Sequence, residues 1–186
     1  MSKNIWVSAD YHVWHSNILV HCSRPFASTL EMNEAIIANH NALVKPNDDF
    51  YHLGDFSWAG PDKTIEVLKR LNGKNKYMVR GNHDKVLENV SVAQHYKWLK
   101  DYYKLTIQDQ GLKYKKQIIV LCHYPMRSWE QKNHNSFMLF GHCHSNLPDD
   151  AKLLSIDVGI DNFKYRPISY DEIKEIMKKR VEAWGK

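Results

Sequence analysis

The sequence predicts a layered α/β domain, and the order of its apolar segments is the main reason. In the first half of the chain, short apolar segments alternate with longer segments whose apolar residues recur at helical spacing. In the second half, apolar segments follow one another directly, and one helical segment closes the chain. This order is typical of two sheets with helices outside them. With 186 residues, we expect a single domain over residues 1–186.

Side chains that can cap a helix mark three expected helices. Ser28 and Ser169 each precede a glutamate by three residues, the spacing of a capping box, and Pro61 suits a first helical turn. The expected helices are therefore residues 28–44, 61–73 and 169–184, with a further short helix at 91–99. The expected strands are residues 4–10, 50–55, 76–84, 103–109, 116–123, 135–144 and 152–159, the fourth and fifth forming a hairpin around Gly111.

The composition is that of a globular protein with an excess of histidine. Hydrophobic residues make up 43% of the chain, and 11 residues are histidine. Every apolar run is shorter than the roughly 20 residues that span a membrane, and the N-terminus lacks the features of a signal peptide. Three cysteines without a C-x-x-C pair argue against a disulfide framework or a zinc ribbon and favour the cytoplasm. A net charge of +5 favours acidic partners such as phosphates.

Five of the expected strands end in residues that commonly bind metals. In chain order these endings are Asp10-x-His12, Gly54-Asp55, Gly81-Asn82-His83-Asp84, His123 and Gly141-His142-x-His144. Ligands gather at the carboxyl ends of strands in open α/β sheets, so these endings are expected to converge in space. The glycines would let the backbone approach a ligand closely.

The side chains in these endings predict two divalent ions. In an extended segment, residues i and i+2 point to one side, so His142 and His144 would face a common point. The candidate ligands are Asp10, His12, Asp55, Asn82, His123, His142 and His144. They exceed the needs of one zinc ion, which takes about four, and suit two ions that share a carboxylate. Imidazole, carboxylate and amide ligands without thiolate favour Mn, Fe, Zn or Ni over Ca and do not choose among these four. Mn²⁺ is the ion that we expect, with Fe, Zn or Ni as alternatives.

The charge of such a centre favours a phosphate substrate. The positive charge of two divalent ions, less the negative charge of two carboxylates and a bridging hydroxide, leaves a net charge of about +1. Such a pair of ions can activate water and bind phosphoryl oxygens. His83 follows the presumed ligand Asn82. It would be free to protonate a leaving alkoxide or to bind a phosphate oxygen.

The ordered motifs DYH, GDF, GNHD, His123 and GHCH resemble those of the calcineurin-like metallophosphoesterase superfamily. The small stand-alone bacterial and phage members are the most similar. The resemblance covers almost the whole chain, because residues 4–26 and 155–173 also resemble the ends of those proteins. It implies a four-layer αββα sandwich of two mixed sheets flanked by helices.

The resemblance also implies a role for each candidate residue. One ion would be held by Asp10, His12, Asp55 and His144. The other ion would be held by Asp55, Asn82, His123 and His142. Asp55 would bridge the two ions, and His83 matches the catalytic histidine of the family.

One motif departs from the family pattern. Many family phosphatases have GDxxDRG, whereas this chain has GDFSWAG, with Trp58 at the place of the second aspartate and no arginine. The acidic partner of the catalytic histidine is therefore missing, as is an arginine that grips phosphate in protein phosphatases. A protein phosphatase is disfavoured. Asp84 could orient His83 instead, although capping of the following turn is the more common role.

Several other residues near the motifs have two interpretations. Candidates for substrate contact, with a structural role as the alternative, are His15, Asn17, Arg24 and Arg80. Aromatic residues that could stack on a base, although core packing is expected of them, are Trp14, Phe56 and Trp58. Residues expected to fix a turn, with metal binding as the alternative, are Asp157 and Asp161. Histidines assigned structural roles are His21, His40, His52, His95 and His134.

Together these patterns predict a cytoplasmic two-metal phosphoesterase in which a metal-bound hydroxide attacks phosphorus and His83 assists the leaving group. A phosphodiester, such as a nucleotide or cyclic nucleotide, is favoured over a monoester because the phosphate-gripping arginine is missing. The alternatives are a phosphomonoesterase and a non-catalytic metal- or nucleic-acid-binding module on the same fold. A complete ligand set together with His83 favours the enzyme. No H-x-H-x-D-H string occurs, which disfavours a metallo-β-lactamase-type hydrolase.

Overall fold

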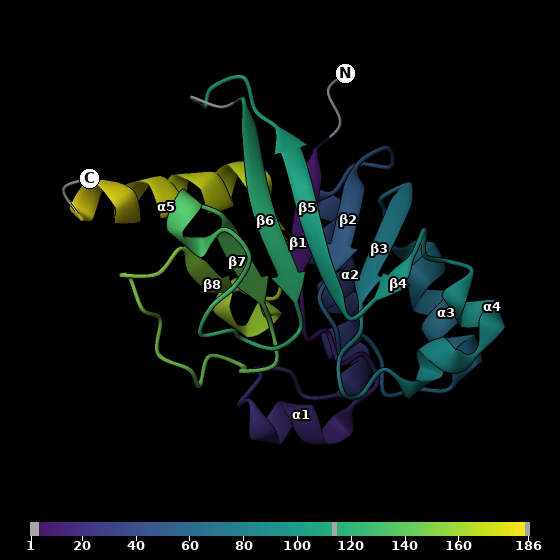
Figure 1. Cartoon of the computed structure of the whole chain (residues 1–186). Coiled ribbons are helices and arrows are strands. Elements are labelled where there is room, and N and C mark those ends of the chain that lie inside the picture. The colour runs from purple at the N-terminus through teal and green to yellow at the C-terminus, as the bar shows by residue number, and fades with distance from the viewer. Residues whose placement is uncertain (1–3, 113–114, 185–186) are drawn as a thin grey trace.

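The computed structural model describes residues 4–112 and 115–184, in which two β-sheets pack face to face (Figure 1). The first sheet has the strand order β4 (Leu99–Lys100), β3 (Asn75–Val79), β2 (Asp49–His52), β1 (Ile5–Ser8) and β9 (Ile168–Ser169). The second has the order β5 (Tyr102–Gln108), β6 (Lys116–Cys122), β7 (Phe137–Phe140) and β8 (Ser155–Asp157). Only the β1–β9 and β5–β6 pairs are antiparallel, so both sheets are mixed.

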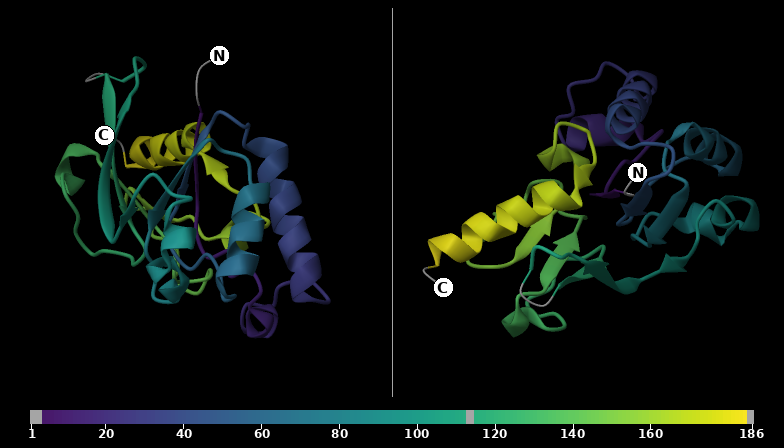
Figure 2. Two further views of the ribbon diagram at one scale, coloured as in Figure 1. Left: turned by 90° about the vertical axis from the view of Figure 1, so that its right-hand side faces the viewer. Right: turned by 90° about the horizontal axis from the view of Figure 1, so that it is seen from above.

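Five helices flank or connect the sheets. They are α1 (Ser16–His21), α2 (Thr29–Leu43), α3 (Pro61–Arg70), α4 (Val90–Ala93) and α5 (Tyr170–Ala183). Short 3₁₀ segments occur at η1 (Lys85–Glu88), η2 (Lys132–His134) and η3 (Ile160–Asn162). Two further views show α2 and α3 on the outer side of the first sheet, with α5 running beside the second (Figure 2). The predicted sandwich of two mixed sheets with flanking helices is confirmed. None of the helices in the described segments has the length and apolar character to cross a membrane.

Side-chain alternation along the strands divides the core into layers. Phe50 and Tyr51 are neighbours in β2, yet Phe50 packs under the helices and Tyr51 packs between the sheets. Leu139 of β7 belongs to the layer between the sheets. Its neighbour Met138 faces outward and packs in a smaller cluster with Trp129, from the segment that follows β6. An irregular segment therefore covers part of the outer face of the second sheet.

The capping residues begin the helices where the sequence predicted. The Ser28 hydroxyl accepts a hydrogen bond from the Glu31 amide at 3.1 Å, and α2 begins directly after Ser28. At α5 the capping box of Ser169 and Glu172 is complete. The predicted hairpin is formed by β5 and β6, which pair from Tyr102 opposite Cys122. Part of its turn, residues 113–114, lies outside the described residues.

Two local predictions were wrong or incomplete. The expected helix at residues 91–99 is confined to α4, and the chain then enters the edge strand β4 because its backbone pairs with β3. Helix α1 was not predicted. Its N-cap is His15, whose Nδ1 accepts a hydrogen bond from the Ile18 amide at 2.8 Å. Histidine is not among the residues that usually mark a helix start.

Candidate metal centre

The loops after β1, β2, β3, β6 and β7 meet at one edge of the sandwich. Strands β1, β2 and β3 are parallel, as are β6 and β7, so their carboxyl ends lie together. Ligand atoms lie within 4.8 Å of one another in three groups within the described residues. Two consist of predicted ligands, Asp10, His12 and His144, and Asp55, His123 and His142; the third, Cys22, His144 and Asp161, shares His144 with the first. The predicted convergence of strand ends is therefore observed.

The Asp55 carboxylate connects the two groups. Its Oδ2 lies 3.5 Å from Nε2 of His12 in the first group and 3.5 Å from Nε2 of His123 in its own. The amide oxygen of Asn82 lies 3.1 Å from the same nitrogen of His123. All candidate ligands thus lie together, and Asp55 occupies the position that a bridging ligand requires.

The backbone that presents these side chains is not extended, which corrects one premise of the prediction. Asp10, His12, Asp55, His142 and His144 all have positive φ, between 46° and 70°. His142 and His144 therefore point into different groups and do not face a common point. Left-handed residues of this kind cost about 1 kcal/mol or more each and concentrate at functional sites.

Two glycines make the close approach of the loops possible. A Cβ on Gly81 would lie 2.2 Å from Oδ1 of Asp55, and one on Gly141 would lie 2.7 Å from Oδ2 of Asp10. Either contact is too short for carbon and oxygen to tolerate. These glycines thus permit close approach of the backbone to the two carboxylates, whereas its approach to a bound ion stays a prediction.

The chemistry of the first group fits a divalent ion. Asp10 Oδ1 and His12 Nε2 are buried and have no hydrogen-bond partner. A buried polar atom without a partner is costly, and a cation would satisfy both atoms. His144 donates from Nδ1 to Oδ2 of Asp161 at 2.8 Å, which leaves its Nε2 as the ligand atom.

The second group is oriented in the same way. His123 donates from Nδ1 to the carbonyl of Leu53 at 2.7 Å, so Nε2 faces Asp55 and Asn82. A ring nitrogen bound to a carbonyl or carboxylate fixes the tautomer of a metal-binding histidine. The residues of both groups therefore fit divalent ions.

The two carboxylates have different electrostatic environments. Burial raises the pKa of Asp10 to about 7. Burial acts in the same direction on Asp55, but hydrogen bonding to His123 and to the His83 amide outweighs it and holds its pKa at about 2. Asp55 is therefore ionised, whereas Asp10 needs nearby positive charge to ionise fully. Burial would lower the pKa of His144, but the bond to Asp161 raises it to about 10.

Arg24 holds this framework together and does not reach the surface. Its buried guanidinium donates to both carboxylate oxygens of Asp161 at 2.8 and 2.9 Å and to the carbonyls of Asp10 and Tyr11 at 2.9 Å or less. This position contradicts the predicted contact of Arg24 with substrate. Asp161, expected to fix a turn, instead supports His144. No local pattern indicated this role, because its partners lie 137 and 17 residues away.

Asp84 also differs from both of its predicted roles. Its buried carboxylate accepts hydrogen bonds from the amides of Gly81 and Asp55 at 2.7 Å and of Phe56 at 2.9 Å. It makes no side-chain cap to η1 and does not orient the ring of His83. Asp84 therefore joins the loop after β3 to the loop after β2. Asp157, by contrast, fixes its turn as predicted through the Gly159 amide at 2.8 Å.

His83 lies exposed at the mouth of the centre. Its amide donates to Oδ1 of Asp55 at 2.9 Å, and its ring centroid lies 5.7 Å from that of His12. The ring of Trp58 lies 4.7 Å from His83 and 4.1 Å from His15. Trp58 is 51% exposed, so the expectation that it packs in the core was wrong.

The other candidate residues occupy varied positions. Phe56 is buried in the core as expected, and Trp14 is half-buried with the Lys63 ammonium 4.7 Å from its ring centroid. Asn17 is exposed on α1, and Arg80 is exposed and paired with Asp101 at 3.2 Å. Substrate contact by Asn17, Arg80 or His15 stays a prediction. His40 has the expected structural role, between the Tyr11 hydroxyl and the Asn72 carbonyl, each at 3.0 Å.

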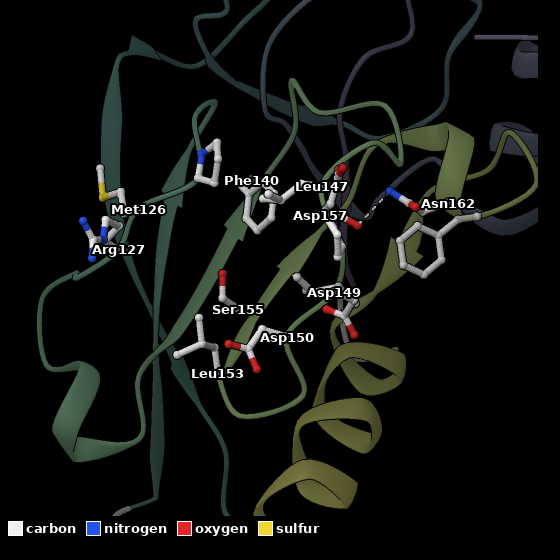
Figure 3. Close-up of a pocket in the computed structure, with 14 residues that line it drawn as sticks. Met126, Arg127, Phe140, Leu147, Asp149, Asp150, Leu153, Ser155, Asp157 and Asn162 are labelled. Carbon is white, nitrogen blue, oxygen red and sulfur yellow. Dashed lines mark hydrogen bonds between the residues drawn. The ribbon is translucent and has the colours of Figure 1, made fainter.

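Two cavities lie near the centre. One, of about 290 Å³, is lined by Trp58, Ala59, Asn82, His83 and Lys85, among others. The other, of about 490 Å³, begins one residue after Tyr124, and Figure 3 shows it between Met126 and Arg127 at one end and Asn162 at the other. Phe140 of β7 and Ser155 of β8 contribute to its wall. None of the candidate metal ligands lines this second cavity.

Fold and site together define a layered α/β protein with a candidate two-metal centre. The sequence profile of the calcineurin-like phosphoesterase family matches residues 3–112. The chain is 32% identical over 184 residues to the uncharacterized protein MJ1445 of Methanocaldococcus jannaschii, covering 95% of this chain and 93% of that protein. The crystal structure of the protein of unknown function AQ665 from Aquifex aeolicus is similar, with a TM-score of 0.70 and 25% identity over 94% of this chain and 100% of that one.

The protein belongs to the calcineurin-like phosphoesterase family. The predicted resemblance is confirmed. Members of this family typically bind divalent metals, and membership supports a phosphoesterase function. The matched segment contains Asp10, His12, Asp55 and Asn82, whereas His123 and the later histidines lie beyond it. The tertiary structure brings both sets of residues to one place.

Asp161→Asn should weaken metal binding by about 10- to 100-fold, because His144 loses the carboxylate that orients its ring. Calorimetric titration of the metal-stripped variant with Mn²⁺ measures this. The matched control is Asp62→Asn, an exposed carboxylate in the first turn of α3, which should bind as the wild type does. Circular dichroism verifies that both variants are folded. Wild-type affinity in folded Asp161→Asn would show that Asp161 does not support the centre.

Metal binding should also release protons and weaken as the pH falls. The His144 pKa of about 10 means that an ion must displace its proton at neutral pH, and the Asp10 pKa of about 7 adds a second proton below that pH. Burial would lower the pKa of His123, but the Asp55 carboxylate raises it, so this ring adds a further proton as the pH falls. The logarithm of the affinity should therefore rise by about one per pH unit well above neutrality and by up to about three below it. Titrations in buffers of different ionisation enthalpy count the protons released. An affinity that does not change with pH would contradict this account.

Proposed function

We propose that the protein is a two-metal-dependent phosphoesterase that hydrolyses phosphodiesters of the nucleotide or cyclic nucleotide type. The position of Asp55 carries the proposal, because its Oδ2 lies 3.5 Å from the nearest imidazole nitrogen of each ligand group. One carboxylate between two sets of candidate ligands, the first of which contains Asp10, matches the ligand arrangement of a binuclear centre. Family membership supports hydrolysis of a phosphate ester.

The ligand assignment follows from the two groups. Asp10, His12 and His144 would hold one ion, His123, His142 and Asn82 the other, and Asp55 both. When bound, two divalent ions supply positive charge that makes water more acidic and neutralises phosphoryl oxygens. The donors suit Mn²⁺, with Fe, Zn or Ni as alternatives.

His83 is the residue that we assign to proton transfer. Its amide is anchored on Asp55, so its position is coupled to the bridging carboxylate, while its exposed side chain can reach a bound ester. It would donate a proton to the leaving oxygen. Trp58 lies against this ring in place of an acidic partner, so His83 is held by ring packing.

A phosphodiester is favoured over a monoester because the two arginines that the sequence offered as phosphate contacts are already engaged. Arg24 is buried in its bonds to Asp161 and backbone carbonyls, and Arg80 pairs with Asp101. A dianionic monoester would demand an additional cation, whereas a monoanionic diester demands less.

The cysteines Cys22, Cys122 and Cys143 are all free, which supports the cytoplasmic location that forms part of this proposal.

Metal-stripped protein reloaded with Mn²⁺ should hydrolyse bis-p-nitrophenyl phosphate faster than p-nitrophenyl phosphate. Release of p-nitrophenol measures both reactions. Faster turnover of the monoester would assign a phosphomonoesterase instead. Turnover of neither substrate with Mn²⁺, Ni²⁺ or Zn²⁺ would favour the non-catalytic binding module.

Two variants separate metal binding from proton transfer. Asp55→Asn should lose activity and at least one bound metal, because the shared ligand is gone. His83→Ala should keep both metals and lose about 100- to 10,000-fold in turnover. Mass spectrometry of bound metal and diester hydrolysis measure these effects. His134→Ala, at an exposed histidine in η2, is the matched control and should retain both properties. Full activity of either site variant would refute the role given to that residue.

A further inference from the structure

Two half-exposed aromatic rings lie on opposite sides of the loop that carries Asn82 and His83. Trp58 is 51% exposed and lies 4.7 Å from the His83 ring. Tyr124 is 46% exposed, and its hydroxyl lies 3.5 Å from the Asn82 amide oxygen. Asn82 and His83 are consecutive in this loop, and each lies against a different one of the two aromatic rings. The candidate centre lies between the two rings.

Tyr124 was not singled out from the sequence, and its contacts place it beside the second ligand group. Its ring centroid lies 5.0 Å from that of His123 and 4.8 Å from that of His142. These rings are inclined to it by 73° and 66°, so neither is stacked on its face. Tyr124 therefore contacts the second ligand group, and Asn82 lies against the same group.

Trp58 approaches the first ligand group through two intervening rings, those of His15 and His83, whose centroids lie 5.4 and 5.7 Å from that of His12. The rings of His15 and His83 are inclined to its indole by 82° and 52°. Within the described residues, the ring contacts of Trp58 and Tyr124 include no parallel stack. Large exposed aromatic rings carry a cost in water, and base–aromatic stacking is worth about 1–3 kcal/mol per base.

We infer that Trp58 and Tyr124 form a pair of base-stacking surfaces, and that the substrate is a phosphodiester joining two nucleosides. This inference rests on the proposed function, since it sets the scissile phosphate at the metal centre between the rings. One base would stack on Trp58 and the other on Tyr124. A diester that carries an aromatic base on each side of its phosphate would stack on both rings.

The cavity that begins at Pro125, the residue after Tyr124, would take one base. Its wall contains apolar side chains, among them Phe140 and Leu153, which suit a base (Figure 3). Its charged lining is mixed, because Arg127 lies there together with Asp150 and with Asp149, which pairs with Arg180 at 2.6 Å. A further phosphate of a continuing strand would therefore meet charges of both signs.

The test compares substrates that differ only in their bases. Protein reloaded with Mn²⁺ is given dithymidine monophosphate and the same diester with both thymines replaced by hydrogen. We expect kcat/KM to be higher for the base-carrying substrate by roughly 5- to 150-fold for each stacked base. An oligothymidylate of about ten residues is compared with the dinucleotide, because it tests whether a free dinucleotide or a single strand is the source of the ester.

Single substitutions assign the preference to the two rings. Trp58→Ala and Tyr124→Ala should each reduce the preference for the base-carrying substrate by roughly 5- to 150-fold. Tyr124→Phe should retain it, because the ring remains and only the hydroxyl is lost. Val90→Ala, which truncates a side chain that is 79% exposed on α4, is the control and should leave the preference unchanged.

The outcomes distinguish this inference from the proposed function. Equal hydrolysis of both diesters by the wild type would overturn the stacking pair and leave a phosphodiesterase. Hydrolysis of bis-p-nitrophenyl phosphate without hydrolysis of either dinucleotide would overturn the substrate class alone. Failure on all three substrates would overturn both proposals. Equal or faster cleavage of the oligothymidylate, with the base preference intact, would support the stacking pair and identify a single strand as its source.

Discussion

The candidate centre depends on burying Asp10 and Asp55 side by side. A buried carboxylate costs several kcal/mol unless donors or positive charge surround it. Backbone amides supply the donors, from His142 to Asp10 at 2.8 Å and from His83 to Asp55 at 2.9 Å. Each donor belongs to a loop from another strand, so satisfying the carboxylates also fixes the loops relative to one another. The left-handed backbone and the close glycines follow from this requirement.

A layer of buried charged residues supports the side chains that face the centre. Arg24 joins the backbone of Asp10 to Asp161, which in turn orients His144. Asp84 joins the loop after β2 to the loop after β3 through three backbone amides. These interactions are buried, and removing one partner from such a pair leaves the other uncompensated. The ligand geometry is therefore set by residues that themselves make no contact with a substrate.

The mouth of the centre differs in character from its interior. Carboxylates and oriented imidazoles line the inside, whereas His83, Trp58 and Tyr124 are exposed at the rim. The arginines that the sequence offered as phosphate contacts are engaged elsewhere, Arg24 within the framework and Arg80 with Asp101. Recognition would therefore depend on aromatic surface more than on added positive charge. This division is consistent with a monoanionic ester that carries aromatic groups.

The sequence by itself determined most of the sheet-forming segments, the capped helices and the identities of the candidate ligands, because periodicity, capping and strand-end motifs are local patterns. The two-residue strands β4 and β9 were not among the predicted strands. The tertiary structure decided how those ligands divide. His142 and His144 separate into two groups because their backbone is left-handed, which an i, i+2 pattern does not reveal. The roles of Arg24, Asp84 and Asp161 arise from long-range hydrogen bonds, which span 137 residues between Arg24 and Asp161 and 29 residues between Asp84 and Asp55. Side-chain burial and long-range pairing exist only once the sheets have packed, so no local pattern could have predicted them.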